Sequence, residues 1–408
     1  MNEIKVYNFS TVDLPSFQHR RINGNEIVQF GDNNLYPEYI LDLYNTSSMH
    51  NAIIENKSKM IAGIDIKVEG EDNLNTGEKI IVDDILNKVS FDCDLQELVR
   101  RISKDYTVFG SFALEIIWNK SRNSIAQINH IDISKVRIGE MVEGKILNYY
   151  YSQDWKNRKI KPTQIQTYNP LTARKYPRQL LYVKEYRTGN DYYALPNYIS
   201  AINWISLDAE ISKFHLSNIQ NGFTPSLLIS FNNGVPTPEE MDVINDQLEK
   251  KYSGSKNAGK LMLTFNESKD KAPDIKVLET SNLDKQFIQL NESVLQNILS
   301  AHKVTSPLLM GIKTAGELGG SNELEIAFKI FENNVIKPER LLIEQTLNKL
   351  LAKFKTPVKI EIVPNSFDIS FSEATLLSIL SIDEMRAKIG YEPVSEITTK
   401  DKNNDIIE

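Results

Sequence analysis

The stretch that most constrains the fold is residues 281–354, which predicts two long helices joined by a glycine-rich loop. Apolar residues in its first part recur every three or four positions, the spacing of one helical face; they are Leu283, Phe287, Leu290, Val294, Ile298 and Ala301. Pro307 ends this helix, because proline cannot extend a helix and pushes the residue before it out of helical geometry. The loop that follows contains Gly311, Gly316, Gly319 and Gly320.

The second helix of this stretch is predicted to begin at Ser321, whose side chain suits an N-cap. Apolar residues then continue at helical spacing as far as Phe354. Pro338 interrupts this run by removing one backbone hydrogen bond and crowding the carbonyl four residues back, so we expect a kink near Asn334. A helix of this length spans about 45–50 Å, which is more than a domain of this size requires. Long paired helices with a loop between them suggest part of an assembly.

Composition places the chain among soluble globular proteins. Its 408 residues are 41% hydrophobic and 25% charged, enough for two or three domains with a substantial core. The single cysteine, Cys93, excludes an internal disulfide framework. No run approaches the roughly 18 apolar residues of a membrane span, and the N-terminus lacks the plan of a signal peptide. We therefore predict a cytosolic, soluble product with no membrane contact.

The net charge of −7 argues against tight, static binding of duplex DNA, because such binding usually needs a basic face. Acidic and basic residues are interspersed, and no basic block stands out. Loose contact with DNA that must keep moving remains open.

The first half of the chain reads as an α+β domain. After a polar arm of about 30 residues, helices are predicted at 37–44, 48–61 and 95–107, with a strand at 64–68. From residue 111 the pattern changes to strand spacing, with segments at 113–118, 125–133, 136–138, 146–151, 164–168 and 180–186.

The second half carries a small α/β insert on two helices. A helix at 195–222 has an apolar stripe formed by Trp204, Leu207, Ile211 and Phe214. The insert follows, with a strand at 226–231, a helix at 238–252 and a strand at 260–265, and the helix from residue 281 leads out of it. Strands are predicted at 358–363 and around 367–371, then a helix beginning near 373 or 383. A polar tail from about residue 398 is expected to be disordered.

Catalytic motifs are broken or missing, so we predict neither an enzyme nor a cofactor. Residues 254–261 nearly form a phosphate-binding loop, but Leu261 replaces the required hydroxyl residue and the loop runs from helix to strand, the wrong order. The five histidines show no metal-ligand spacing, and Cys93 has no partner cysteine. A nucleic-acid motor or nuclease stays as an alternative that these broken motifs disfavour.

Several local strings, taken in order, resemble the portal proteins of tailed double-stranded-DNA phages, the rings through which the genome enters and leaves the capsid. The strings are Tyr36-Pro37, Asn51-Ala52 and residues 61–64 near the start, 221–226 and 254–260 around the insert, and 304–311 before the long helix with Phe328, Phe331 and Pro338. The resemblance covers about residues 31–371, and its specificity lies in order and spacing. At 193–196 the chain lacks a glycine that relatives often carry, which affects only the local turn.

The resemblance implies a portal-type α+β fold. The wing would comprise residues 1–195, and two stem helices, 196–222 and 281–303, would carry a clip at 223–280. A tunnel loop would follow at 304–320, then the long wing helix and wing strands at 321–372, and a short crown with the C-terminal tail at 373–408. Portals of this family form twelve-subunit rings at one capsid vertex of the virion and are assembled in the host cytoplasm. Their partners are the major capsid protein, the terminase large subunit, head–tail adaptor proteins and the DNA that passes through.

Three groups of residues are the resulting site predictions. For the DNA channel they are the tunnel-loop residues Ile312, Lys313, Thr314, Ala315, Gly316, Glu317, Gly319 and Gly320. For docking of terminase and adaptor they are the clip residues Glu239, Glu240, Lys250, Lys251, Lys256, Asn257 and Lys260. For packing between subunits they are the stem residues Trp204, Leu207, Ile211, Phe214, Phe287, Leu290, Val294 and Ile298. The alternatives are a bundle packed only within one chain, a loop that merely connects two helices, and a ring-forming scaffold with no DNA passage.

Overall fold

A computed structural model describes residues 27–31, 33–157, 159–221, 227–231, 237, 239–240, 242–243, 261–265, 283–312 and 321–365. Within these ranges only the backbone is described at 73, 214, 217–221, 227–231, 261–265, 283–287 and 321–322. The N-terminal arm, most of the predicted tunnel loop, and the predicted strand, helix and tail beyond residue 365 lie outside the described residues.

A six-stranded sheet forms one layer of the molecule. Its spatial order is β3-β2-β9-β8-β7-β4, and every neighbouring pair is antiparallel except β8 and β9. The strands are β2 (Ser111–Trp118), β3 (Ile125–Ile131), β4 (Val136–Ile138), β7 (Asn148–Tyr151), β8 (Thr163–Thr167) and β9 (Arg178–Lys184). A short hairpin, β5 (Met141–Val142) and β6 (Lys145–Ile146), projects beside it. The predicted run of β segments is therefore confirmed, with some boundaries shifted by a few residues.

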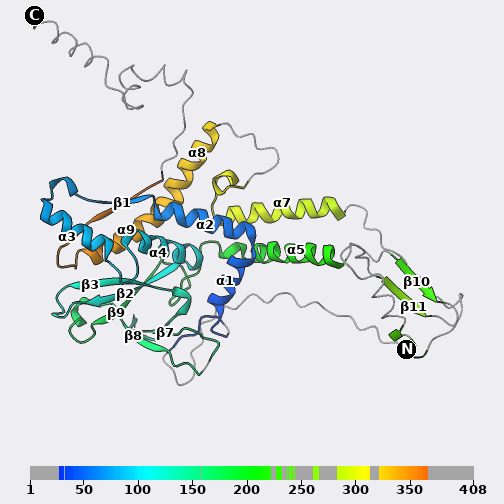
Figure 1. The fold of residues 1–408 in the computed structure, drawn as a ribbon, viewed down its shortest axis with the longest axis horizontal. Coiled ribbons are helices and arrows are strands. Elements are labelled where there is room, and N and C mark those ends of the chain that lie inside the picture. The colour runs from blue at the N-terminus through cyan, green and yellow to red at the C-terminus, as the bar shows by residue number, and fades with distance from the viewer. Residues whose placement is uncertain are drawn as a thin grey trace, which may run out of the picture.

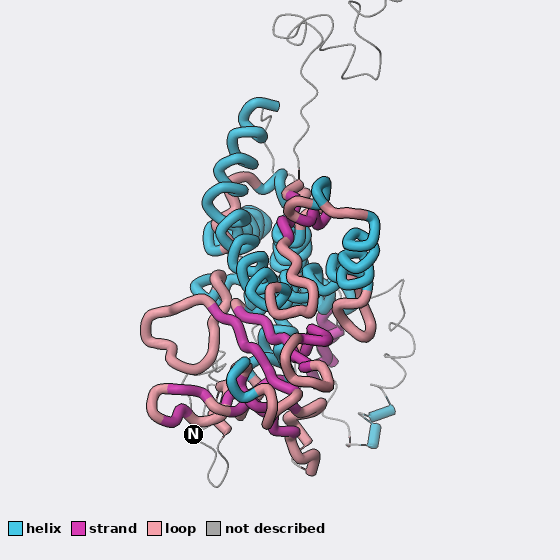
Figure 2. The backbone as a smooth tube through the Cα atoms, turned by 90° about the vertical axis from the view of Figure 1, so that its left-hand side faces the viewer, coloured by secondary structure: helices cyan, strands magenta, loops and turns pink. Residues whose placement is uncertain are grey.

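Helices cover one face of this sheet (Figures 1 and 2). They are α1 (Tyr36–Thr46), α2 (Ser48–Ala62), α3 (Thr76–Asn87) and α4 (Leu95–Phe109). The Asp94 side chain caps α4 by accepting a hydrogen bond from the Glu97 N–H, at 2.7 Å, which satisfies one of the free donors of the first turn. Gly110 ends α4 with a φ of 73°, and a Cβ there would lie 2.6 Å from the Leu195 carbonyl oxygen.

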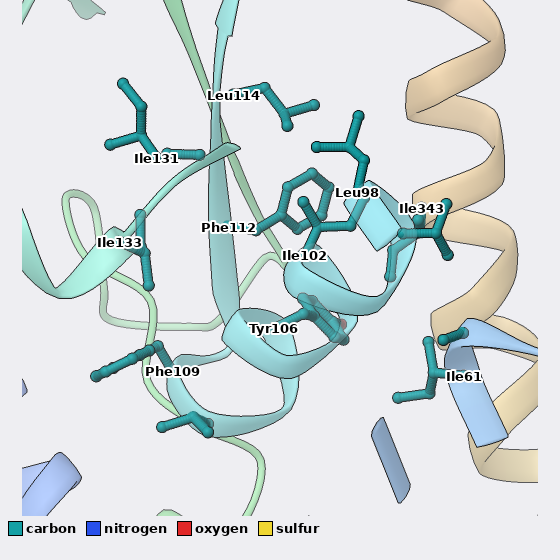
Figure 3. Close-up of a cluster of buried hydrophobic side chains, with 14 of the residues drawn as sticks. Ile61, Leu98, Ile102, Tyr106, Phe109, Phe112, Leu114, Ile131, Ile133 and Ile343 are labelled. Atoms are coloured by element: carbon teal, nitrogen blue, oxygen red, sulfur yellow. The ribbon is translucent and has the colours of Figure 1, made fainter. Parts of the chain in front are cut away.

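The main core lies on both sides of α4 (Figure 3). Toward the sheet, α4 packs against Phe112 and Leu114 of β2, and toward the other helices it meets Ile61 of α2 and Ile343 of α9. All four of these side chains are 0% exposed. Full burial of a side chain of this size contributes about 1.5–3 kcal/mol, so this layer fixes the orientation of α2 and α9.

Two helices leave the body side by side and form what we call the stalk. They are α5 (Ile202–Asn221), which follows a 3-10 turn (Ile199–Ala201), and α7 (Leu283–Ala301). Strands β10 (Leu227–Phe231) and β11 (Leu261–Phe265) form a parallel pair at the far end of the stalk (Figure 1). Both predicted strands and both predicted carrier helices are present, although the first helix begins at Ile202 rather than at residue 195. Most of the predicted helix at 238–252 lies outside the described residues.

The long C-terminal helix is interrupted where the sequence predicts a kink. It consists of α8 (Ser321–Phe331), a π-helical turn (Glu332–Ile336) and α9 (Lys337–Leu351), with Pro338 in the first turn of α9. Proline has no N–H to donate and its ring crowds the preceding turn, and a π turn is one way to accommodate it.

A further two-stranded sheet contains β12, the last strand of the described chain. It pairs β1 (Asp65–Val68) with β12 (Ile360–Val363) in antiparallel register, Asp65 opposite Val363 and Val68 opposite Ile360. This sheet packs near α9 (Figure 1). Two further 3-10 turns of the body, Glu71–Asn73 and Pro170–Thr172, connect its elements, as does Ile133–Lys135 between β3 and β4.

Candidate functional site

The root of the stalk is joined to α2 by buried polar contacts. The Asp208 carboxylate of α5 accepts a hydrogen bond from the Ser47 hydroxyl at 2.7 Å, next to the start of α2. His50 of α2 and His302, just beyond α7, are joined through Nδ1 and Nε2 at 3.0 Å. The Tyr198 ring packs on both imidazoles, with centroids 4.4 and 4.8 Å away. Both stalk helices are thus anchored to the same turn of α2.

The two histidines are uncharged at neutral pH. Burial lowers the pKa of His50 to about 3, and burial, followed by His50 and Lys57 nearby, lowers that of His302 well below its ordinary value. Each is 2% exposed or less. They are core histidines that hold two segments together.

A buried ion pair connects α2 to α9. Lys57 Nζ donates to Glu339 Oε1 at 2.8 Å, and Asn197 Nδ2 donates to the same oxygen at 3.2 Å. The side chains of the pair are 5% and 10% exposed. Because removal of one partner from such a pair leaves an uncompensated charge, costing about 3–5 kcal/mol, this contact fixes α9 against the helix that also anchors the stalk.

Arg340 holds the π turn. It donates to Glu332 at 2.6 Å and to the carbonyls of Met60 and Ile61 at 2.7 and 3.3 Å, at the end of α2. Asn56 of α2 donates to the Met310 carbonyl at 3.1 Å, at the root of the predicted tunnel loop. One helix, α2, therefore fixes the positions of the stalk, the π turn and the start of the loop.

A cavity of about 470 Å³ opens beside the π turn. Five of the charged groups that line it make structural contacts: Arg340 with Glu332, Lys359 with Glu69 at 2.5 Å, and Glu344 with the Ile362 N–H at 3.0 Å. Among the described residues no group of three or more acidic, histidine or cysteine side chains could hold a metal ion. None of the helices described is both long and apolar enough to cross a membrane.

The stalk residues predicted to pack between subunits divide into three sets. Val294 and Ile298 are 1% and 0% exposed within the single chain, so packing inside the subunit already accounts for them and they are withdrawn from the proposed interface. The side chains of Phe214 and Phe287 lie outside the described residues. Half-buried side chains remain at Trp204, Leu207, Ile211 and Leu290. Helical spacing finds an apolar face, but it cannot tell which chain covers it.

Two strongly exposed apolar residues were missed by the sequence reasoning. Leu216 of α5 and Ile288 of α7 are 56% and 59% exposed. They lie toward the far half of the stalk (α5 ends at Asn221 and α7 begins at Leu283). The sequence could have identified them, because each is an apolar residue that lies outside the main apolar stripe of its helix.

Apart from Ile288, the exposed residues of α7 whose side chains are described are polar, and they carry little charge. Between residues 288 and 301, six exposed residues fall on one helical face at spacings of three and four, namely Gln289, Glu292, Ser293, Gln296, Asn297 and Ser300. Glu292 is the one charged residue in that range. On α5, by contrast, Glu210 and Lys213 are exposed and form an ion pair at 2.8 Å.

Most of the predicted loop and clip residues are not among those described. Ile312 is half-buried, and its N–H donates to the Pro307 carbonyl at 3.1 Å; residues 313–320 lie outside the described part. In the clip, Glu239 and Glu240 are exposed and helical, and Thr237 Oγ1 accepts from the Glu240 N–H at 3.4 Å. Lys250, Lys251, Lys256, Asn257 and Lys260 fall outside the described residues.

Comparison with known proteins identifies one matching family and two partial relatives. The family model described as phage portal protein matches residues 51–390. An uncharacterised protein of Rickettsia bellii is 30% identical over 160 residues, 39% of this chain and 40% of that protein. An uncharacterised protein of Rickettsia felis is 24% identical over 225 residues, 53% and 56% of the two chains. The matched regions thus span about half the length of these relatives.

Solved structures show the same fold at low identity. A chain from the neck of an empty gene transfer agent particle, computed with C6 symmetry, superposes with a TM-score of 0.55 at 15% identity, covering 88% of this chain and 94% of that one. A chain from the neck of the native particle, computed with C12 symmetry, gives 0.53 at 16% identity, covering 88% and 95%. The fold is that of the protein chains that build such necks. The chain belongs to the phage portal protein family.

Proposed function

We propose that this chain forms a twelve-subunit portal ring at one vertex of a capsid, serving as the channel for DNA packaging and ejection. The family match carries this proposal, and the C12 symmetry of a neck with the same fold supports the subunit number. In this ring residues 1–195 and 321–372 form the wing, the stalk forms the stem, residues 223–280 form the clip, 304–320 the tunnel loop, and 373–408 the crown and tail. The ring is assembled in the host cytoplasm and becomes part of the virion.

Within this ring, the polar side of α7, whose one charged residue between 288 and 301 is Glu292, is proposed to face the DNA. This helix ends at Ala301, just before the tunnel loop that begins at residue 304. Its exposed amides and hydroxyls can touch phosphates without the strong attraction of lysine or arginine. Twelve subunits at −7 each give 12 × −7 = −84 for the ring. A channel without rows of basic residues lets DNA slide, because each added phosphate contact strengthens binding and slows movement.

The tunnel loop is proposed to line the narrowest part of the channel. Its glycines reach backbone angles that other residues avoid, and its charges are sparse, so Lys313 is the expected phosphate contact. Replacing Gly316 and Gly319 by proline should leave rings intact and reduce packaged, retained DNA about tenfold or more, since proline fixes φ. The matched control, alanine at both positions, should have a smaller effect. DNA yield is measured in particles assembled with each variant. Normal retention by the proline variant would show that the loop is not the constriction.

The clip is proposed as the docking surface for the terminase large subunit and later for the head–tail adaptor. Replacing Lys256 and Lys260 by glutamate should preserve the ring and weaken terminase binding about tenfold, roughly 1.4 kcal/mol. The same exchange at Lys145 of the β5–β6 hairpin, an exposed lysine of the wing, is the control and should not change binding. Failure of the clip variant to form rings would instead make this loop a contact between subunits.

The energy for packaging comes from a separate terminase ATPase in this proposal, and the portal hydrolyses nothing. A ring-forming capsid scaffold without DNA passage is the second candidate, and a ring with no central opening in electron micrographs would favour it. ATP hydrolysis by the purified chain would favour a nucleic-acid motor.

A further inference from the structure

Strand β1 presents an open hydrogen-bonding edge. Within the part of the chain that the structure describes, β1 pairs only with β12. The Glu69 N–H donates to the Lys359 carbonyl at 2.9 Å, which sets the alternation of the antiparallel ladder. By that alternation the N–H and C=O groups of Ile66 and Val68 point away from β12. The Ile66 N–H is taken up by the Asp65 carboxylate at 2.8 Å, and the Ile66 carbonyl and both groups of Val68 remain at the edge.

The opposite edge of the same sheet is closed by α9. Asn348 accepts from the Ile360 N–H at 2.8 Å and donates to the Ile360 carbonyl at 2.9 Å, as a neighbouring strand would. Glu344 accepts from the Ile362 N–H at 3.0 Å. Three of the four outward-facing backbone groups of Ile360 and Ile362 are occupied in this way, and α9 lies along this edge, so a further strand would join this sheet beside β1.

The apolar face of the sheet is also incompletely covered on the β1 side. Ile360 and Ile362 of β12 are each 2% exposed, whereas Ile64, just before β1, is 58% exposed, and Ile66 and Val68 are half-buried. Side chains of adjacent strands lie next to each other on a shared face. An added strand with apolar residues at alternate positions would therefore cover this row and satisfy the open edge.

The chain itself contains a segment with this pattern. Residues 367–371, Phe-Asp-Ile-Ser-Phe, alternate apolar and polar side chains, and they follow β12 after only residues 364–366. Val363 at the end of β12 lies opposite Asp65 at the start of β1. To run antiparallel to β1 in the same chain, the segment would need a crossover of about a dozen residues. To run parallel to β1, the segment would have to cross from β12 to the far side of β1, a distance of two strand spacings or roughly 10 Å. Only residues 364–366, which include Pro364, are available for this crossing.

We infer that residues 367–371 of one subunit add as a strand to β1 of the neighbouring subunit. The inference rests on the ring proposed above, which places a second copy beside every subunit. A strand from a neighbouring subunit needs neither the long crossover nor the three-residue crossing over β1, because it approaches β1 from outside the chain. Each contact around the ring is then reinforced by backbone hydrogen bonds to the neighbour and is heterologous, because one subunit supplies the strand and the next supplies the edge.

Cysteine cross-linking tests this exchange on the full-length protein. In a Cys93→Ser background, Lys67→Cys on the exposed side of β1 is combined with Asp368→Cys or, separately, with Ser370→Cys. These positions share the polar face of the added strand, so the apolar row stays intact. Cβ atoms of facing residues lie about 4.5–5.5 Å apart, close enough for a disulfide after small shifts. Mild oxidation should then yield a ladder of covalent multimers on a non-reducing gel with at least one pair. The control, Lys145→Cys with Asp368→Cys, should remain monomeric.

Light scattering before oxidation separates the possible failures. Absence of rings in the Cys93→Ser protein would count against the proposed function itself. Intact rings that give only an internally cross-linked, faster-migrating monomer would show that the segment pairs within its own chain, which would overturn the exchange. Intact rings with no cross-link from either pair would overturn it as well. As a further check, Ile369→Asp should abolish the ladder, because it places a charge in the apolar row.

Discussion

Replacing Gly63 by alanine is expected to destabilise the protein by more than about 3 kcal/mol. Gly63 ends α2 with φ 68° and ψ −175°, a combination that only glycine adopts at low cost. A Cβ at this position would lie 2.3 Å from the Val363 carbonyl oxygen and 2.8 Å from Ile362 Cγ2. The first of these contacts is with backbone, so relief requires moving β12. Strain and steric overlap therefore act together on the β1–β12 sheet.

Gly70 provides a matched control at the other end of β1. Its φ of 77° and ψ of 17° are left-handed helical, and nothing lies within 4 Å of a Cβ built there. The Gly70→Ala variant should lose only about 1–2 kcal/mol, the cost of a left-handed L-residue. Urea unfolding followed by circular dichroism compares the variants at one protein concentration, because assembly adds to apparent stability. Equal losses would mean that the contact of Gly63 with β12 is unimportant.

Local signals explain why much of the secondary structure could be predicted. Helix α4 begins after Asp94 and ends at Gly110, both of which have local physical causes in capping and left-handed backbone geometry. The long C-terminal helix is interrupted beside Pro338 for an equally local reason. Such signals act over a few residues, so one sequence suffices to find them.

Helix α3 was not predicted, although it carries a capping box between Asn75 and Glu78. The apolar residues Ile80, Ile81 and Val82 are consecutive, so no clear helical period is visible. Ile80 and Ile81 are 64% and 46% exposed and only Val82 is buried. The capping pair, an asparagine followed three residues later by glutamate, was the usable signal.

Contacts between distant residues could not be predicted from the sequence. His50 pairs with His302, Lys57 with Glu339, and β1 with β12, and nothing in the local pattern of either partner specifies the other. The same limit applies to the candidate stem interface. Val294 and Leu290 share the spacing of one helical stripe, yet only the tertiary packing shows that Val294 is covered within its own chain.

The second large expected effect concerns assembly, which is the central claim. The stalk exposes Leu216 and Ile288 and leaves Trp204, Leu207, Ile211 and Leu290 half-buried in a single chain. Burying apolar surface is favourable by about 25 cal/mol per Å². In a closed ring each subunit can cover such surface with a different, complementary face of its neighbour. A stalk that leaves apolar side chains uncovered should therefore not stay monomeric at ordinary concentrations.

Multi-angle light scattering on the purified full-length protein, at micromolar concentration and physiological salt, tests this claim most directly. Twelve subunits of 46.6 kDa predict a particle of 12 × 46.6 = 559.2 kDa. A single species near that mass, seen as a ring with a central opening in negative-stain images of the same fraction, is the expected result. A stable monomer of 46.6 kDa under these conditions would contradict the portal ring.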